Sequence, residues 1–320
     1  MESWYGNRSA GAEGFFEEIA DEEFELLGDA EKNPEFVAVE SRTFVQDAWS
    51  RFRQNGLATV SLVFLAVMVL LAVVVPIVSP YTYDEMDFAQ INALPNAAHW
   101  LGTDKFGRDI LVRLMVGARI SLSVGFAAAF LNLVIGVTYG GICGYFGGKT
   151  DMILMRVVDI IYSVPTLLYV ILVMLVFGSN VFSVLIAIGI SSWVDMARLV
   201  RAQIMSLKEE EYARAAFIIG ASRWRIIFKH LIINCVGAII VNTMLMVPNA
   251  IFTEAFLAFV GSGISIPQAS WGTMANDAAH SLLQTQPLQL LWPVLAISLT
   301  MLSLNAIGDG LGEALDPKKR

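Results

Sequence analysis

The sequence predicts an all-α integral membrane protein with six transmembrane helices. Of its 320 residues, 56% are hydrophobic and only 16% are charged, whereas charged residues make up about 25% of an ordinary soluble domain. The apolar residues also gather in long runs without charge, and about 20 such residues let a helix cross about 30 Å of hydrocarbon. Composition and run length together place the chain in the membrane class.

The apolar runs locate the spans, and one run has to be divided. Apolar residues from Ile160 to Val194 extend too far for one span, and turn residues at Phe177–Asn180 interrupt them, so two helices are expected there. Pro165, Pro248 and Pro293 predict kinks. The expected spans are residues 56–83, 120–148, 153–177, 181–198, 231–260 and 288–307.

The distribution of lysine and arginine predicts the orientation of the spans. Seventeen of the 21 basic residues would lie on the side of the N-terminus, and the other four lie between the first two spans. Because positive charge accumulates on the cytoplasmic side, both termini are expected in the cytoplasm. The four basic residues on the opposite side are Lys105, Arg108, Arg113 and Arg119.

The N-terminal segment is acidic and then amphipathic. Residues 1–47 carry 13 acidic and three basic side chains, so we expect 1–41 to be a cytoplasmic tail that is solvated and weakly ordered rather than a docking element. Residues 42–55 place Phe44, Val45, Ala48, Trp49 and Phe52 on one helical face. With Arg42, Arg51 and Arg53 able to reach anionic headgroups, this segment is expected to be an interfacial helix that contacts membrane lipid.

The remaining segments complete the predicted organisation. A transmembrane domain over residues 56–307 would contain external loops at 84–119 and 261–287 and a cytoplasmic loop at 206–225, followed by a cytoplasmic tail at 308–320. In the first external loop, charges of both signs favour a packed cap joining two helices over a substrate contact. His99 is expected to be a hydrogen-bonded loop residue rather than a ligand.

The cytoplasmic loop at 206–225 carries the most informative pattern. Ser206 and Glu209 form an S-x-x-E capping box, and Gly220 suits a helix C-terminus, which predicts a helix of about 13 residues. Its Tyr212, Ala215, Ala216 and Ile219 form an apolar face of mostly small side chains. Such a face suits a helix lying in a partner's groove, but a helix resting on its own protein or on lipid fits the pattern equally well.

The context of this loop resembles a known family. The pattern AA-x-x-x-G, from Ala215 to Gly220, resembles the EAA loop of bacterial ABC importer permeases, although Arg214 stands where that pattern has Glu. A more specific resemblance is to the second permease subunit of dipeptide, oligopeptide and nickel importers, although Ile233 stands where many relatives have Pro. Its motifs cover roughly residues 44–317 and are HWLGTDKFGRD (99–109), GARISL (117–122), GASRWRIIFKHLIIN (220–234), SWGTM (270–274) and GDGLGEALDP (308–317).

The resemblance implies a non-catalytic, six-helix permease subunit of the type I ABC importer kind in the bacterial cytoplasmic membrane. Its implied partners are a homologous second permease, two cytoplasmic ATPase subunits that hold ATP and Mg²⁺, and an extracellular substrate-binding protein. No cofactor, metal or nucleic acid is expected on this chain. Oligopeptides are the first expected substrate, and dipeptides or nickel the second. The implied ATPase-coupling residues are Glu211, Tyr212, Arg214, Ala215, Ala216, Ile219 and Gly220.

Ionisable residues inside the spans are functional hypotheses, because a charge in hydrocarbon costs several kcal/mol. Arg156 with Asp159, and Asp195 with Arg198, stand three residues apart and are expected to form structural ion pairs. Glu254 has no such neighbour. Together with Asn249 it is expected either to face the translocation path or to bond to a neighbouring helix.

Three further patterns concern small residues and histidines. Gly136, Gly140 and Gly144 form two GxxxG steps that predict close helix packing. Cys143 and Cys235 lie in apolar runs and are expected to be small buried hydrophobes. The segment CGYFGGKT at 143–150 lacks the first glycine of a P-loop and follows a helix instead of a strand, so we reject phosphate binding there.

Two other classes of protein compete with a transport subunit. A self-sufficient carrier or channel would show paired broken helices in two halves, and no convincing internal repeat is visible. A membrane enzyme would need a catalytic cluster, but the chain has no HExxH or GxSxG motif and its three histidines are scattered.

Overall fold

The computed structural model describes residues 43–261, 263, 268–281 and 287–315. The chain divides into two units, Met1–Thr43 and Phe44–Arg320, and the second unit contains all the elements below. In the described part of the chain the regular structure is helical, with one isolated β-bridge between Thr103 and Asp109. The predicted tail at 1–41 and parts of the 261–287 and 308–320 segments lie outside the described residues.

Five helices among the described residues are long and apolar enough to cross a membrane, and a bent pair raises the number to six. The five are α2 (Gly56–Val78), the continuous helix Ile110–Phe146, α7 (Val181–Leu207), α11 (Val236–Phe259) and α13 (Leu288–Leu315). The bent pair is α5 (Gly148–Ser163) and α6 (Thr166–Phe177), which meet at 83°. Six spans therefore agree with the prediction when the bent pair counts as one.

The bend confirms the kink predicted at Pro165, but it divides the expected helix over 153–177 into two. Val164, which precedes Pro165, has φ −92° and ψ 122°, so it is extended. Proline disfavours the helical conformation of the residue before it, which ends α5 at this point. By contrast, Pro248 and Pro293 lie inside the uninterrupted helices α11 and α13.

The second span begins ten residues earlier than predicted. Asp109 caps α3 (Ile110–Leu131) by accepting a hydrogen bond of 2.9 Å from the Val112 amide. The helix continues through the π-helical turn η3 (Asn132–Gly136) into α4 (Val137–Phe146). Its 37 residues make a helix of roughly 55 Å, far more than about 30 Å of hydrocarbon. The external loop therefore ends at Asp109, and Arg113 and Arg119 belong to α3.

The last helix is also longer than predicted. The structure continues α13 to Leu315, where a cytoplasmic tail from residue 308 was expected. Gly310 in this extension packs against Ala58 and Phe52, so the end of α13 is held by α2 and by α1 (Phe44–Gln54). The helix predicted over 42–55 is present as α1, with Trp49 exposed and the Arg53 guanidinium 4.8 Å from its ring.

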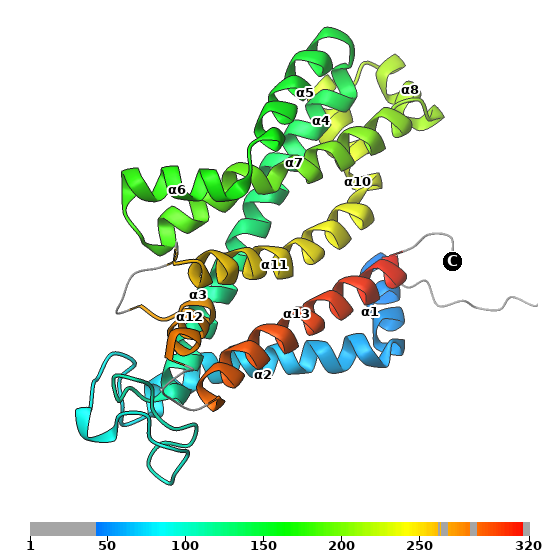
Figure 1. The fold of residues 1–320 in the computed structure, drawn as a ribbon. Coiled ribbons are helices and arrows are strands. Elements are labelled where there is room, and N and C mark those ends of the chain that lie inside the picture. The colour runs from blue at the N-terminus through cyan, green and yellow to red at the C-terminus, as the bar shows by residue number, and fades with distance from the viewer. Residues whose placement is uncertain (1–42, 262, 264–267, 282–286, 316–320) are drawn as a thin grey trace, which may run out of the picture. The chain divides into compact units, whose positions relative to one another are not determined.

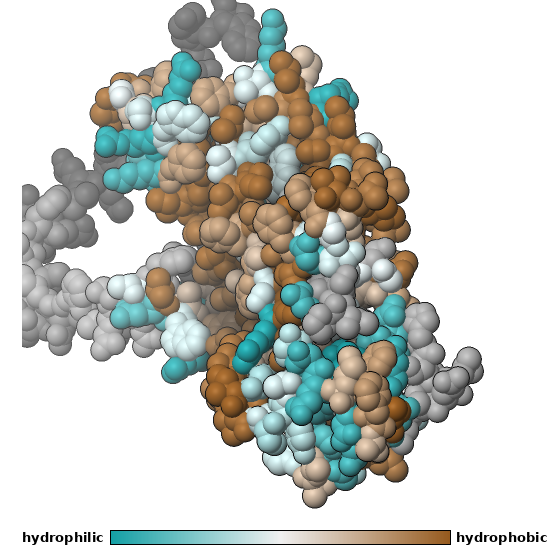
Figure 2. Space-filling model, turned by 90° about the vertical axis from the view of Figure 1, so that its left-hand side faces the viewer, coloured by the Kyte–Doolittle hydropathy of each residue, from teal (hydrophilic) through white to brown (hydrophobic). Residues whose placement is uncertain are grey.

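The spans pack in a continuous series. In Figure 1, α2 and α13 lie side by side, and α13 packs on α11, which in turn packs on α3. A second group is formed by α4, α6 and α7. Figure 2 shows hydrophilic residues gathered at the lower end, at the level of the 79–109 loop, mainly hydrophobic surface across the middle, and further hydrophilic residues at the upper end. Many large apolar side chains on α2, α6 and α11 are exposed, as expected of helices that face lipid or other membrane subunits.

The glycine ridge of α4 packs on α7 as the GxxxG pattern predicts. A Cβ at Gly136 would lie 2.6 Å from the Cβ of Met196, and one at Gly144 would lie 2.7 Å from the Arg201 carbonyl oxygen. At Gly140 it would collide with the Ala197 carbonyl oxygen. Only glycine permits this approach of the two backbones.

Short helices complete the fold. These are η2 (Phe88–Gln90) in the external loop, α8 (Glu211–Ile218), α9 (Arg223–Arg225), η4 (Ile226–Leu231), α10 (Ile232–Asn234) and α12 (Trp271–Ser281). Helix α12 lies in the segment predicted as an external loop and packs between α11 and α13. The predicted fifth span over 231–260 is thus divided among η4, α10 and α11.

Candidate functional site

The α8 helix stands at the end of α7 and carries the residues predicted to contact an ATPase. In Figure 1 it lies beyond the ends of α4 and α7. The Lys208 ammonium donates a 3.1 Å hydrogen bond to the Gly144 carbonyl oxygen, which ties the end of α7 to the end of α4. Ala213 is buried against the cluster that contains Ile226. One side of α8 therefore rests on its own chain.

The outer side of α8 is apolar and exposed. Ile218 and Ile219 are 82% and 85% exposed, and Phe217 is 64% exposed. Tyr212 and Ala215 are also exposed, whereas Ala216 is half-buried. Such a group of large apolar side chains at the tip of a helix is unfavourable in water, which marks it as a contact surface.

The C-terminus of α8 is closed by Gly220 as predicted. Gly220 has φ +89°, its amide donates to the Phe217 carbonyl at 3.0 Å, and the Ala221 amide donates to the Ala216 carbonyl at 3.0 Å. These two bonds form a Schellman motif, which requires the left-handed conformation that glycine adopts without strain. Gly220 thereby sets the direction in which the chain leaves α8.

The N-terminus of α8 differs from the prediction. Ser206 lies in the last turn of α7, and Glu210 precedes α8 without a side-chain capping bond, so the Ser206–Glu209 capping box is wrong. Glu209 instead accepts a 2.7 Å hydrogen bond from Arg214. The helix has eight residues instead of about 13.

Partial burial, and next the charge of Glu210, raise the pKa of the Tyr212 hydroxyl, so it stays neutral in the physiological range.

The predicted ion pairs are half right. Arg156 pairs with Asp159 at 3.8 Å, but Arg198 reaches the same carboxylate at 3.0 Å instead of pairing with Asp195. Asp195 is exposed and has no ion pair among the described residues. Arg198 of α7 therefore pairs with a residue of α5 and not with Asp195 of its own helix, because the packing of α5 on α7 brings Asp159 within reach. Sequence spacing could not show this contact.

Glu254 takes the second of its two predicted roles and bonds to a neighbouring helix. It is 1% exposed, and its Oε2 accepts a 3.0 Å hydrogen bond from the Ser121 hydroxyl of α3. The Trp271 amide of α12 donates a 3.3 Å hydrogen bond to the same Ser121 oxygen. Glu254 thus joins α11 to α3, and through Ser121 to α12. Its other carboxylate oxygen, Oε1, has no hydrogen-bond partner in the described structure.

Asn249 lies on a different face of α11 from Glu254. Five residues of an α-helix correspond to a rotation of about 140° between the two side chains. Asn249 is exposed, and Phe252, Phe256 and Phe259 are exposed along the same side of α11. The structure therefore separates the two residues that the sequence grouped as candidates for the path.

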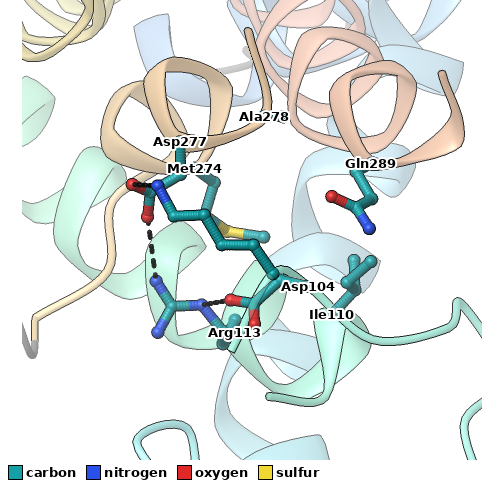
Figure 3. Close-up of a pocket in the computed structure, with 8 residues that line it drawn as sticks. Asp104, Ile110, Arg113, Met274, Asp277, Ala278 and Gln289 are labelled. Carbon is teal, nitrogen blue, oxygen red and sulfur yellow. Dashed lines mark hydrogen bonds and ion pairs between the residues drawn. The ribbon is translucent and has the colours of Figure 1, made fainter. Parts of the chain in front are cut away.

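The external loop is a packed cap, as predicted, and ion pairs lock it to α12. The fully buried Arg108 pairs with Asp104 at 2.7 Å and with Asp277 at 3.4 Å. Lys105 also pairs with Asp277, at 2.9 Å, and Arg113 lies 3.5 Å from Asp104. Figure 3 shows Arg113 between the two carboxylates.

Hydrogen bonds extend this cap. His99 is buried with its Nδ1 2.9 Å from Asp109 Oδ2, so it is a hydrogen-bonded loop residue as expected. The Gln289 amide donates to Asn92 at 2.9 Å and to the Thr103 carbonyl at 3.0 Å. The cavity in Figure 3 measures about 20 Å³, enough for about one water molecule. This cavity between the loop, α3 and α12 is too small for a peptide.

Two functional contacts were not foreseen. Asp277 lies about 170 residues from its partners, so no local pattern indicates its contacts. Arg119 of α3 donates to the Ala72 carbonyl at 2.5 Å and to the Val73 carbonyl at 2.8 Å. Pro76 has no amide hydrogen and so leaves the Ala72 carbonyl without its helical partner. The proline in α2 was the signal that could have indicated a donor nearby.

The helical spans, the close glycine packing and the exposed apolar tip of α8 define a multi-span membrane protein with a contact surface at one end. Residues 136–320 match the family described as binding-protein-dependent transport system inner membrane component, and residues 43–95 match the N-terminal transmembrane domain of oligopeptide transport permease C. The chain belongs to this family of transport permeases.

Similar proteins agree with this assignment. The chain is 46% identical over 293 residues to the oligopeptide transport system permease protein OppC of Bacillus subtilis, covering 92% of this chain and 94% of that protein. It is 44% identical over 303 residues to the dipeptide transport system permease protein DppC of Bacillus subtilis, covering 95% of each.

A solved structure supports the fold. One chain of the inward-facing MetNI methionine ABC transporter matches with a TM-score of 0.53 and 16% identity, covering 63% of this chain and 96% of that chain.

Proposed function

We propose that this protein is one of two homologous permease subunits of a bacterial ATP-binding-cassette importer for oligopeptides. The proposal places the chain in the cytoplasmic membrane with both termini in the cytoplasm. Two ATPase subunits bind ATP and Mg²⁺, and an extracellular binding protein delivers the peptide. This chain performs no catalysis and forms half of the translocation path.

The exposed apolar tip of α8 carries the proposal. Phe217, Ile218 and Ile219 project from the tip of a helix whose other side packs on η4. Full burial of each of these side chains in a partner's groove is worth roughly 1.5–3 kcal/mol. Movement of an ATPase subunit would then reach the spans through α8. Residues Glu211, Tyr212, Arg214, Ala215, Ala216, Ile219 and Gly220 are the proposed coupling residues.

The proposed path follows the exposed side of α11. Asn249, with Phe252 and Phe256 beyond it, faces outward from the chain where the second permease would stand. Glu254 is excluded from direct contact with substrate because it is buried against α3. Its proposed role is to hold α11, α3 and α12 together.

Dipeptides are the second candidate substrate. The observation that favours them is the 44% identity to a dipeptide permease, which covers as much of this chain as the match to the oligopeptide permease. Membership of a binding-protein-dependent family favours a transport subunit over a self-sufficient carrier or a membrane enzyme.

The test is affinity purification of the tagged full chain from its native membrane in mild detergent. We expect two ATPase chains and a second permease to co-purify, and the ATPase activity to rise with the binding protein loaded with oligopeptides more than with dipeptides. Ile218→Glu should abolish co-purification of the ATPase chains, whereas Val45→Glu, at another exposed site, should not. A chain that is recovered alone and transports a solute in liposomes without ATP would contradict the proposal.

A further inference from the structure

A basic and aromatic surface follows α8 and has no part in the proposed coupling. Arg223, Arg225 and Lys229 are exposed on α9 and η4, and Trp224 and Phe228 are exposed among them. The two rings stack with centroids 6.0 Å apart and an interplanar angle of 22°. These five residues are called the 223–229 surface below.

The inner side of the same segment is packed. Ile226, Ile227 and Leu231 are almost fully buried, so the backbone that carries the 223–229 surface is fixed on the bundle. Ser222 caps the segment by accepting a hydrogen bond of 3.4 Å from the Arg225 amide. The exposed cations and rings are therefore presented by a rigid element.

The positive charges of this surface are not compensated within the chain. None of its three cations has an ion-pair partner in the described part of the protein, and the Arg223 guanidinium contacts only a ring, that of Phe146, at 5.8 Å. Other arginines at this end of the bundle are paired: Arg198 with Asp159, Arg201 with Asp151 and Arg214 with Glu209. In contrast to these three arginines, the three cations of the 223–229 surface have no anionic partner among the described residues.

The position of the surface indicates which anion it meets. The segment leads directly through α10 into the membrane span α11 (Figure 1). Along its exposed side the cations and rings give way to Ile233, which is 57% exposed. A helix that passes from lipid headgroups into hydrocarbon carries cations and aromatic rings first and aliphatic side chains after them.

We propose that the 223–229 surface is a binding site for the headgroups of anionic phospholipids. Arg223, Arg225 and Lys229 contact the phosphates, while Trp224 and Phe228 lie at the boundary with the acyl chains. An acidic surface of an ATPase subunit would satisfy the cations but would leave Phe228 and Ile233 in water. A lipid satisfies both kinds of side chain, which is why lipid is the favoured occupant.

The test uses brominated lipids, which quench tryptophan fluorescence on contact. The full chain, purified in detergent with its co-purifying permease but without ATPase chains, is titrated with brominated phosphatidylglycerol or phosphatidylcholine. The Trp224 signal is the difference from Trp224→Phe. We expect brominated phosphatidylglycerol to quench this signal at a much lower fraction of lipid than brominated phosphatidylcholine does. The triple variant Arg223→Gln, Arg225→Gln, Lys229→Gln should raise that fraction roughly a hundredfold, because each of the three cations near a membrane surface contributes about 1 kcal/mol and about 1.4 kcal/mol corresponds to a factor of ten.

Controls separate the possible outcomes. Arg156→Gln removes an exposed cation that is paired with Asp159 and should leave the lipid preference unchanged. Equal quenching by the two lipids, or an unchanged preference in the triple variant, would overturn the proposal. Displacement of phosphatidylglycerol by equimolar inorganic phosphate would overturn it as well, since the site would then bind free phosphate. If added ATPase chains remove the quenching, the surface belongs to the ATPase interface and not to lipid.

The result does not depend on the transported substrate. Loss of peptide-stimulated ATPase activity with normal lipid preference would contradict the proposed function alone. Loss of the lipid preference with normal coupling of transport to ATP hydrolysis would contradict this inference alone.

Discussion

Single residues decide how closely the helices of this permease approach and how its contact helix ends. Gly136, Gly140 and Gly144 allow the backbones of α4 and α7 to touch, and Gly220 takes a left-handed conformation that closes α8. The two cases differ physically. At Gly140 the obstacle to a larger residue is space, whereas at Gly220 no atom lies within 4 Å and the obstacle is conformation alone.

Gly220→Pro should uncouple transport from ATP hydrolysis while leaving membrane insertion intact. Proline fixes φ near −65°, far from the observed +89°, and removes the amide that donates to Phe217. Gly220→Asn is the matched control, because asparagine tolerates the left-handed region better than other residues. Uptake and peptide-stimulated ATPase activity of the assembled complex measure the effect. Near-normal coupling in the proline variant would show that the cap does not set the position of α8.

Gly140→Ala should destabilise the bundle, because the added methyl group meets the backbone carbonyl of Ala197, which cannot rotate away. Overpacking of this kind costs about 1–3 kcal/mol. The adjacent Gly141→Ala is the control, since its methyl group would make an ordinary contact of 3.4 Å with Ile227. Thermal unfolding of the purified protein in detergent should show a lower Tm for Gly140→Ala only. Equal values for the two variants would argue against the tight α4–α7 contact.

At the scale of elements, ion pairs join the external cap to α12, and their charges come from the 79–109 loop, α3 and α12. Asp277 of α12 compensates Lys105 and Arg108 of the loop, while Asp104 of the loop compensates Arg108 and Arg113. Because Arg108 is fully buried, its charge depends on both carboxylates. Removing one partner of a buried charge costs several kcal/mol, so this contact is a strong link between the two elements.

Asp277→Asn should release the 79–109 loop from α12. The loop would then exchange amide hydrogens faster and become more sensitive to protease, because Lys105 and Arg108 lose their shared carboxylate. Hydrogen–deuterium exchange of peptides from the loop measures the change. Asp84→Asn, at an exposed position of the same loop, serves as the control. Unchanged exchange in Asp277→Asn would mean that packing alone holds the cap.

At the scale of the whole molecule, the spans and the loops assign two sides to the protein. The cap with Phe88 lies at the end where α2 finishes and α3 begins, and Lys149 lies at the opposite end of the helix Ile110–Phe146. Nine basic residues from Lys149 to Lys229 fall on the side of Lys149, and positive charge is retained in the cytoplasm. The charge pattern therefore predicts that Lys149 is cytoplasmic.

Cysteine labelling tests this orientation. Phe88→Cys and Lys149→Cys place thiols at exposed sites, while the native Cys143 and Cys235 are buried. An impermeant maleimide should label Phe88→Cys in spheroplasts, and Lys149→Cys only after the membrane is permeabilised. The reverse pattern would place both termini outside the cytoplasm and would remove α8 from reach of an ATPase.

Much of the fold followed from local patterns, and most of the errors concern where helices begin and end. Apolar runs predicted the spans, and the GxxxG steps, Gly220 and the role of His99 were also foreseen. The bounds of α3 and α13 were wrong because both helices continue past the hydrocarbon into polar residues that other elements cover. The capping box failed because α7 continued through Ser206 to Leu207. For α7 and α13, tertiary contacts, which local spacing does not contain, hold the last turns of the helix.

The sequence by itself determined the class of the protein, the number of spans and the position of the contact helix, because hydrophobic run length, proline and glycine act locally. Only the tertiary structure decided the partners of the charges. It joined Asp159 to Arg198, Asp277 to the external cap and Glu254 to Ser121. Coulomb and hydrogen-bond energies depend on distances in space, and residues far apart in the chain come within 3–4 Å only after the helices pack.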